Sequence, residues 1–354
     1  MALIVDSLIG LFVDLFFATT NNQINESTNQ QKMKLYTVEK ISLCYNALTS
    51  IVILIFAGTI AGATRMLEIR ALIALAIFAT AYAYGKMESK NASRGGKSSA
   101  PTPAMQVLSA LRYFFHLALL AYWYPETFEF NRYLPNLDHV FVNLEQTLFG
   151  SQPSLIFSQM MPQKWFNELM NLGYFSYFPL IWAVVVIFYV SCREHFEKAI
   201  NTIVAGFFIY YLIFIVVPVA GPQYYFPASR DAACHVSTTI GTYFDKNENI
   251  TPETVPDAYL FRELVKSAQK YERPTGAFPS SHVGITTILM LLLWFHERKW
   301  VYIFAPVYGL LVMSTVYIKA HYLVDVPAGI ISAVLIYWGL QKLWNKETQS
   351  LNFG

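Results

Sequence analysis

Two histidines and one aspartate stand at the ends of two apolar runs in the last quarter of the chain. His282 lies in the stretch "GAFPSSHVGI" (276–285), and His321 and Asp325 lie in "STVYIKAHYLVDVPAG" (314–329). A carboxylate four residues from a histidine can share its helix face or a turn-to-helix junction. There it accepts a hydrogen bond from one ring nitrogen and leaves the other nitrogen as a nucleophile. The spacing therefore predicts that His321 is a nucleophile oriented by Asp325.

The residues before His282 predict an anion-binding site. Pro279 suits the first turn of a helix, because its missing N–H would be unpaired there. Ser280 and Ser281 supply hydroxyl groups beside the free backbone N–H groups of that turn, and such a helix N-terminus attracts anions. Each motif alone is a common helix start or an interfacial histidine. Together, at equivalent depths on successive helices, they predict phosphoryl transfer through a phosphohistidine.

The composition indicates that these residues belong to a membrane protein. Of the 354 residues, 55% are hydrophobic and only 14% are charged, whereas soluble domains carry about a quarter charged residues. The net charge of +2 is too small and too dispersed for a nucleic-acid surface. Cys44, Cys192 and Cys234 lack the spacing of a disulfide framework or a zinc site. We therefore expect lipid, and not nucleic acid, around this chain.

The apolar runs predict an all-α fold, a polytopic membrane helix bundle of about 6–8 spans. The first twenty residues repeat apolar positions every three or four residues, which predicts an interfacial helix, with a shortened span as the alternative. We expect an N-terminal membrane region (1–170), a catalytic core (171–344) and a cytoplasmic tail (345–354). Eight candidate spans lie at roughly 41–64, 71–85, 104–124, 171–191, 199–220, 279–296, 300–320 and 326–344.

Basic residues in the short loops set the expected orientation. The segment 86–103 carries four basic residues among Gly, Ser and Pro, which predicts a cytoplasmic loop. Alternation along the spans then places both long loops, about 125–170 and 221–277, on the outer face. His282 opens one helix from that face and His321 closes the next, so the site is predicted at the outer membrane face. The stretch 130–150 alternates like an interfacial helix that caps this site.

Together these motifs resemble the type 2 phosphatidic acid phosphatase (PAP2) superfamily, which carries Lys-x6-Arg-Pro, Pro-Ser-Gly-His and Ser-Arg-x5-His-x3-Asp. Pro279-Ser280-Ser281-His282 corresponds to the second motif, and Ser314-Thr315 with His321 and Asp325 to the third. The resemblance covers about 210–340. It implies a PAP2-like catalytic core in which His321 attacks phosphorus, Asp325 orients it and His282 protonates the leaving alkoxide. Ser280 and the adjacent N–H groups would hold the phosphate, with no metal or other cofactor.

The basic residues that bind phosphate in the family are matched only in part by this sequence. Thr315 stands where the family usually has Arg, and Ser281 where it usually has Gly. Lys266 and Arg273 fit the first motif in spacing, but Arg273 lies only seven residues before Ser280. Arg273 closes the loop that leads into the site and is a phosphate-binding candidate there.

Three further candidates have an ordinary membrane alternative. Lys319 is a candidate for the positive charge missing at Thr315, with interfacial snorkelling as the alternative. Tyr224 and Tyr225 are candidates for a lipid entrance, or for the aromatic belt of a membrane protein. In the third predicted span we expect Arg112 to snorkel toward the cytoplasmic surface, and a head group or an acidic partner inside the bundle is the alternative.

Within the superfamily, the pattern resembles the inositol phosphorylceramide synthases. Their Gly-x-Phe-Pro-Ser-x-His-x-Gly and Ser-Thr-x-Tyr-x3-His-Tyr-x2-Asp-x2-Ala-Gly are matched at 276–284 and 314–329. This implies transfer of a phosphorylated head group, such as inositol phosphate, from a phospholipid donor to ceramide or a similar lipid-alcohol acceptor. The first alternative is a lipid-phosphate phosphatase with water as the acceptor. The second is a non-enzymatic transporter or scaffold with a degenerate site.

Overall fold

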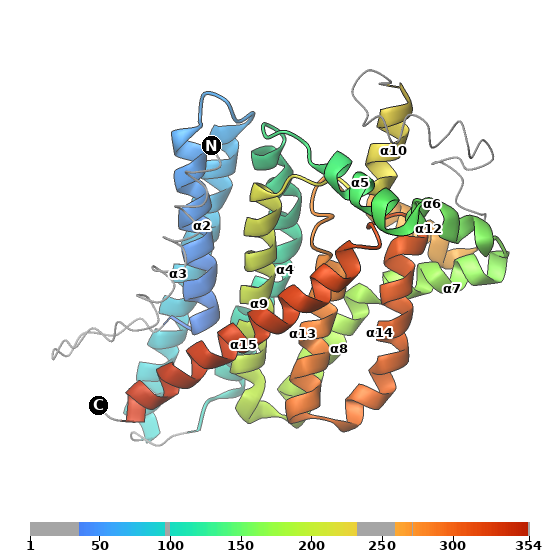
Figure 1. Ribbon diagram of the computed structural model, residues 1–354. Coiled ribbons are helices and arrows are strands. Elements are labelled where there is room, and N and C mark those ends of the chain that lie inside the picture. Colours follow the sequence, from blue (N-terminus) through green and yellow to red (C-terminus); the bar gives the residue numbers. More distant parts are fainter. Residues whose placement is uncertain (1–34, 96–99, 232–258, 271, 353–354) are drawn as a thin grey trace. The chain divides into compact units, whose positions relative to one another are not determined.

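The computed structural model describes residues 35–95, 100–231, 259–270 and 272–352. Within these residues the regular structure is entirely helical (Figure 1). The chain divides into two compact units, residues 1–124 with 343–354, and residues 125–342. The all-α prediction is confirmed, whereas the predicted interfacial helix at 1–20 lies outside the described residues.

The first unit contains α2 (Thr37–Ile55), α3 (Ala63–Gly95) and most of α4 (Pro103–Asn131). Glu39 and Arg112 form a buried ion pair of 2.6 Å, and the guanidinium of Arg112 lies 3.7 Å from the centre of the Tyr36 ring. The prediction that Arg112 snorkels is therefore wrong. A charge away from water requires a partner, and Glu39 supplies it inside the unit.

The second unit carries both histidine motifs. Its central helix, α13 (Ser281–His296), packs against α8 (Tyr177–Ser191), α9 (Arg193–Val216) and α14 (Lys299–Tyr317). The unit also contains most of α15 (Asp325–Asn352). Its shorter helices are α5 (Asp138–Phe149), α6 (Pro153–Met160), α7 (Lys164–Phe175), α10 (Pro222–Asp231) and α12 (Leu260–Gln269).

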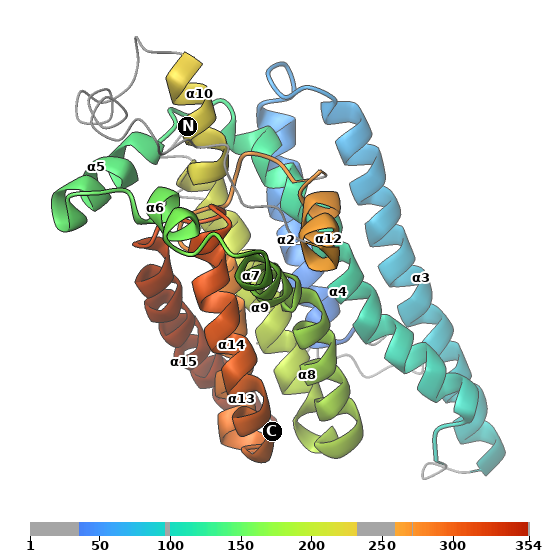
Figure 2. The same ribbon diagram turned by 90° about the vertical axis from the view of Figure 1, so that its right-hand side faces the viewer.

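The short helices gather near one end of this bundle. Figures 1 and 2 show α5, α6 and α10 near the end where α13 begins and α14 stops, whereas the turns α8–α9 and α13–α14 lie at the opposite end. The predicted interfacial helix within 130–150 corresponds to α5. The two motifs and the helix expected to cap them are thus at the same end of the unit.

Six helices of the described chain are long and apolar enough to cross a membrane. The α7–α8 pair, bent by 44°, adds a seventh if it is one span, and α13 is a shorter apolar helix. These numbers agree with the predicted 6–8 spans. The bend falls at Ser176, inside the predicted span 171–191. The six helices are Thr37–Ile55, Ala63–Ser93, Pro103–Asn131, Arg193–Val216, Lys299–Tyr317 and Asp325–Asn345.

Two glycines allow the close approach that brings the motifs together. A Cβ on Gly284 would lie 1.9 Å from the hydroxyl oxygen of Tyr210, so α13 can press against α9 only without a side chain there. A Cβ on Gly329 would lie 2.7 Å from the carbonyl oxygen of Ser280. Gly329 therefore lets α15 approach the start of α13. Contacts this close leave no room for a methyl group in an interior of normal packing density.

Candidate active site

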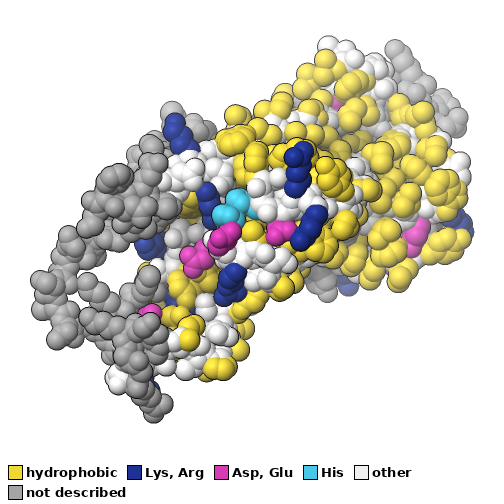
Figure 3. Space-filling model, turned by 90° about the horizontal axis from the view of Figure 1, so that it is seen from below, with side chains coloured by type: hydrophobic (Ala, Val, Ile, Leu, Met, Phe, Trp, Pro, Cys, Tyr) yellow, Lys and Arg dark blue, Asp and Glu magenta, His cyan; other side chains and the backbone are white. Residues whose placement is uncertain are grey.

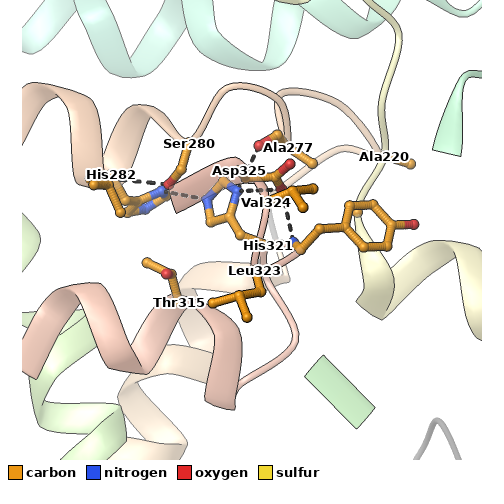
Figure 4. Close-up of polar contacts among 12 residues, drawn as sticks. Ala220, Ala277, Ser280, His282, Thr315, His321, Leu323, Val324 and Asp325 are labelled. Carbon is orange, nitrogen blue, oxygen red and sulfur yellow. Dashed lines mark hydrogen bonds and ion pairs between the residues drawn. The ribbon is translucent and has the colours of Figure 1, made fainter. Parts of the chain in front are cut away.

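His282 and His321 face each other at the end of the unit where α13 begins. His321 Nε2 lies 3.4 Å from His282 Nδ1, and the two ring centres are 5.5 Å apart. Figure 4 shows the His321 ring between His282 on one side and Ala277 and Asp325 on the other. The side chain of His321 is buried, with 3% of the residue exposed. The geometry brings together the two histidines that the sequence analysis placed at one face.

Two acceptors orient the ring of His321. Its Nδ1 lies 2.7 Å from the carbonyl oxygen of Ala277 and 3.5 Å from Asp325 Oδ2. A carbonyl oxygen only accepts, so Nδ1 carries the proton and Nε2 keeps its lone pair toward His282. Asp325 had been expected to be the acceptor for this ring. In the structure it is the more distant of two acceptors, and its Oδ2 also accepts from the N–H of Tyr322 at 2.8 Å.

Two tyrosines hold His282. The ring centres of Tyr174 and Tyr177 lie 4.6 and 4.3 Å from that of His282, on either side of the bend between α7 and α8. Aromatic contacts at these distances fix the plane of a ring. The sequence analysis missed both tyrosines because they lie more than a hundred residues before His282 and belong to no motif.

The start of α13 forms the expected anion-ready helix end, with one change. The N-cap is Ser280, whose Oγ accepts from the N–H of Val283 at 3.3 Å. Pro279 therefore precedes the cap, joined to Phe278 by a cis peptide bond, and is not in the first turn as predicted. The N–H of Ser280 donates to the carbonyl oxygen of Asp325 at 3.3 Å. The N–H groups of Ser281 and His282 have no acceptor within the helix, since a helix leaves its first N–H groups unpaired.

The predicted cations lie in different surroundings. Lys319 is buried, with 1% exposed, two residues before His321, and it is the non-glycine residue with a positive φ (66°) in the described chain. Lys266 lies half-exposed on α12, paired with Glu263 at 2.8 Å, and Arg273 is exposed. Thr315 is buried and its carbonyl oxygen accepts from the N–H of His321 at 3.0 Å. The positive φ of Lys319 is a strained conformation two residues from His321, and such strain is typical of functional sites.

The two tyrosines proposed for a lipid entrance lie on α10. Burial raises the pKa of Tyr224 to about 12, where Glu272 raises it further and Arg273 lowers it. Burial also raises the pKa of Tyr225, with a smaller contribution from Asp138. Glu272 itself lies within electrostatic reach of His321, although burial is the larger influence and raises the pKa of this carboxyl group. Tyr224 is thus close to charged groups that border the site.

Two carboxylates on α5 bind the loops of the site, and the sequence analysis missed both. Asp138 accepts from the N–H groups of Ala220 and Gly221 at 2.7 and 2.8 Å and from the hydroxyl of Tyr322 at 2.8 Å. Glu145 Oε1 accepts from the N–H groups of Leu323 and Val324 at 2.5 and 3.2 Å.

The pKa of Glu145 is shifted by its surroundings. Burial raises the pKa of Glu145 to about 7, the two N–H groups lower it, and the charge of Asp325 raises it.

The alternation of 130–150 predicted the helix. The signal for the two acids was their seven-residue spacing, which puts them on one face of it.

Residues 139–339 match the sequence model of the PAP2 superfamily. The chain belongs to the PAP2 superfamily. The matched range runs from α5 into α15 and so contains both histidines, Asp325 and Glu145. No curated protein and no solved structure matches the chain. Membership in this superfamily, together with helices able to cross a membrane, supports a phosphatase or phosphotransferase that acts on lipids.

Proposed function

We propose that this PAP2 protein is an integral membrane lipid phosphotransferase that works through a phosphohistidine on His321. The observation that carries the proposal is the pair of facing ring nitrogens, His321 Nε2 and His282 Nδ1, at the start of α13. Nε2 keeps its lone pair because Nδ1 donates to the carbonyl of Ala277. A nucleophilic nitrogen and a second titratable ring thus lie side by side, which suits attack on phosphorus by one and proton transfer to the leaving alkoxide by the other.

The reaction takes two steps. Nε2 of His321 forms a bond to phosphorus while the bond to the lipid alkoxide breaks, and His282 gives its proton to the leaving alcohol. A second alcohol then attacks phosphorus, His282 takes its proton, and the N–P bond breaks. The first N–H groups of α13 and the buried Lys319 would stabilise the charge on the phosphate oxygens, and Ser281 begins that turn.

A cavity beside the site supports a lipid substrate. It has a volume of about 400 Å³ and lies between α6, α14 and the start of α15. Leu323, from the turn that follows His321, is one of its walls, and α14 is a candidate membrane span. An apolar cavity that joins the catalytic turn to a membrane helix fits an alkyl chain. Its lining consists of Ser151, Pro153, Ile156, Phe157, Met160, Val312, Met313, Val316, Leu323 and Val326.

Transfer to a lipid alcohol is favoured over hydrolysis by the burial of His321. This residue is almost wholly buried, and two tyrosine rings lie against the half-buried His282. Exclusion of water protects a reactive intermediate from hydrolysis. The motif resemblance to the inositol phosphorylceramide synthases points the same way, toward an inositol phosphate-like head group and a ceramide-like acceptor. A lipid-phosphate phosphatase remains the second candidate because water can use the same groups.

The test uses the purified full chain in proteoliposomes with labelled phosphatidylinositol, with and without ceramide. We expect label to move to ceramide and diacylglycerol to appear only when ceramide is present. Release of inositol phosphate or phosphate at the same rate without ceramide would favour the phosphatase. Parallel assays identify the head group that the protein transfers. They use phospholipid donors with choline, ethanolamine or glycerol head groups, and phosphatidic acid.

Two variants separate an enzyme from a transporter or scaffold. His321→Asn removes the nucleophile, and His195→Asn removes a histidine at the opposite end of the unit as the matched control. We expect activity and an acid-labile phosphoenzyme only in the wild type and in His195→Asn. Full turnover in His321→Asn, or no turnover of any lipid phosphate by the wild type, would contradict an enzyme that acts through this site.

A further inference from the structure

Helix α5 contacts the turn between His321 and Asp325 through two buried acids. Asp138 and Glu145 are seven residues apart, which places them on one face two turns from each other. Both are fully buried. Asp138 accepts from the loop before α10 and from the hydroxyl of Tyr322, whereas Glu145 accepts from the backbone between His321 and Asp325. The face of α5 that carries these acids is thus turned toward the site.

The two N–H groups bound by Glu145 belong to a helix start. α15 begins at Asp325, so the N–H groups of Leu323 and Val324 come just before its first turn. N–H groups at a helix start need acceptors from outside the helix. A side-chain oxygen of the same chain segment usually supplies one. Here Glu145 Oε1 supplies both from another helix, at 2.5 and 3.2 Å.

The turn bound by Glu145 carries His321, the proposed nucleophile, and Asp325, which helps to orient its ring. His321 and Asp325 stand at its two ends, and Asp325 Oδ2 closes it by accepting from the N–H of Tyr322. Glu145 Oε2 and Asp325 Oδ1 are both buried and have no hydrogen-bond partner among the described residues. Glu145 therefore reaches the turn through the two hydrogen bonds to its backbone.

We propose that Glu145 is a positioning residue for phosphoryl transfer: it fixes the turn that holds His321 and Asp325 at the reacting distance. The inference rests on the proposed function, since it assigns a role toward the same nucleophile. Glu145 touches neither phosphorus nor the lipid in this role. Its loss should therefore slow the chemical step and leave substrate binding unchanged.

Three substitutions at Glu145 test this in the full-length protein with phosphatidylinositol and ceramide in proteoliposomes. For Glu145→Ala, which removes the acceptor, we expect kcat to fall by roughly 10²-fold, the cost of a reacting group misplaced by about 1 Å. KM should stay within about three-fold, because Glu145 makes no contact that binds the substrate equally in the ground state and the transition state. Glu145→Gln keeps a carbonyl acceptor and should restore most of kcat. Glu145→Asp keeps the charge but is one methylene shorter, so its kcat should lie between those of the other two.

A matched control and a folding check accompany these variants. Glu194→Ala removes an exposed carboxylate at the opposite end of the unit, and we expect unchanged kcat and KM. Melting temperature and size-exclusion profile in detergent show which variants fold. Where Glu145→Ala does not fold, the Gln and Asp variants carry the test. Rescue by Gln with a lower kcat for Asp at constant KM supports the proposal.

Two results would overturn the inference. One is a folded Glu145→Ala protein, or a Glu145→Asp protein, with the kcat of the wild type. The other is a rise in KM at constant kcat. In both cases His321→Asn remains inactive, so the proposed function survives while the role of Glu145 does not. Activity in His321→Asn itself would instead overturn the proposed function.

Discussion

The second unit contains two pairs of neighbouring histidines, one at each end of α13. His282 is the second residue of this helix and faces His321, with ring centres 5.5 Å apart. His296 is its last residue and lies against His195, with ring centres 4.2 Å apart. Figure 3 looks onto the end that carries the second pair, where histidine, acidic and basic side chains lie together at the surface. By distance alone, the second pair is the closer one.

The surroundings of the two pairs differ. His195 is 40% exposed and lies 3.5 Å from Glu194 Oε1, whose side chain is 81% exposed. At such accessibility water can replace the contact between His195 and Glu194 at little cost in free energy. The ring of His195 is therefore weakly fixed. His321 is held by a carbonyl, a carboxylate and a buried turn, and His282 by two tyrosine rings. We therefore assign catalysis to the first pair on its fixed acceptors and the burial of His321, and not on proximity.

The largest effect should come from the nucleophile. In His321→Asn the ring nitrogen that faces His282 is lost, so transfer should fall to background, by roughly 10⁴-fold or more. The measurement is turnover of labelled phosphatidylinositol, with phosphoenzyme trapped by denaturation at alkaline pH as the second readout. Phosphoenzyme in the variant would mean that another residue carries the phosphoryl group.

Loss of the proton donor should cost less than loss of the nucleophile. We expect His282→Asn to lower kcat by about 10²–10⁴-fold, the usual contribution of a general acid. A donor with a nitrophenolate leaving group needs no proton, so the same variant should recover most of its rate in forming the phosphoenzyme. Equal losses with both donors would assign His282 a role other than proton donation.

Much of this contrast was predictable from the sequence, because it follows from long patterns. The apolar runs and their alternation across a membrane predicted that His282 and His321 would meet at one end of the bundle. The spacing of Ser280 from the helix that follows predicted an anion-ready helix start. These patterns are local or repeat over many residues, so tertiary contacts do not obscure them.

The supporting contacts were not predictable from the sequence. The closer acceptor for His321 is the carbonyl oxygen of Ala277, and every residue carries such a carbonyl. Glu145 lies 178 residues before Leu323, whose N–H it binds. The ion pair of Arg112 joins it to Glu39 on another helix. Each contact depends on which helices become neighbours, and one sequence does not contain that information in a local pattern.

The proposed catalytic pair, His282 and His321, also depends on the tight packing of α13. In Gly284→Ala the new Cβ would meet the Tyr210 hydroxyl, and we expect a loss of stability of about 1–3 kcal/mol from overpacking. Activity should fall as well, because His282 is two residues away. Gly309→Ala on α14 is the matched control, since its Cβ would meet nothing within 4 Å. Thermal melting of both variants in detergent makes the comparison, and equal melting temperatures would show that α13 can move away from α9 freely.

Burial at the catalytic end should make stability depend on pH. The pKa of Glu145 is raised from 4.5 to about 7 by burial, so the folded protein favours its protonated form. The resulting stabilisation relative to Glu145→Gln is fully present below about pH 4.5 and is lost as pH rises through 7. Its size is on the order of 3 kcal/mol. The measurement is the difference in melting temperature between wild type and variant at pH 5 and pH 8. A constant difference would show that Glu145 does not titrate in this range.

The smallest effect is expected at the second histidine pair, His195 and His296, and it is the most direct test of the comparison. His195→Asn and His296→Asn remove rings that lie closer together than the catalytic pair but have no buried acceptor network like that of His321. Surface substitutions of this kind usually change stability by within about 0.5 kcal/mol. We expect kcat and KM to stay within about two-fold of the wild type, since no uniform or transition-state binding is lost. A large loss of kcat in either variant would mean that the two ends of α13 act together, and fixed acceptors would then no longer distinguish the proposed catalytic pair from the second one.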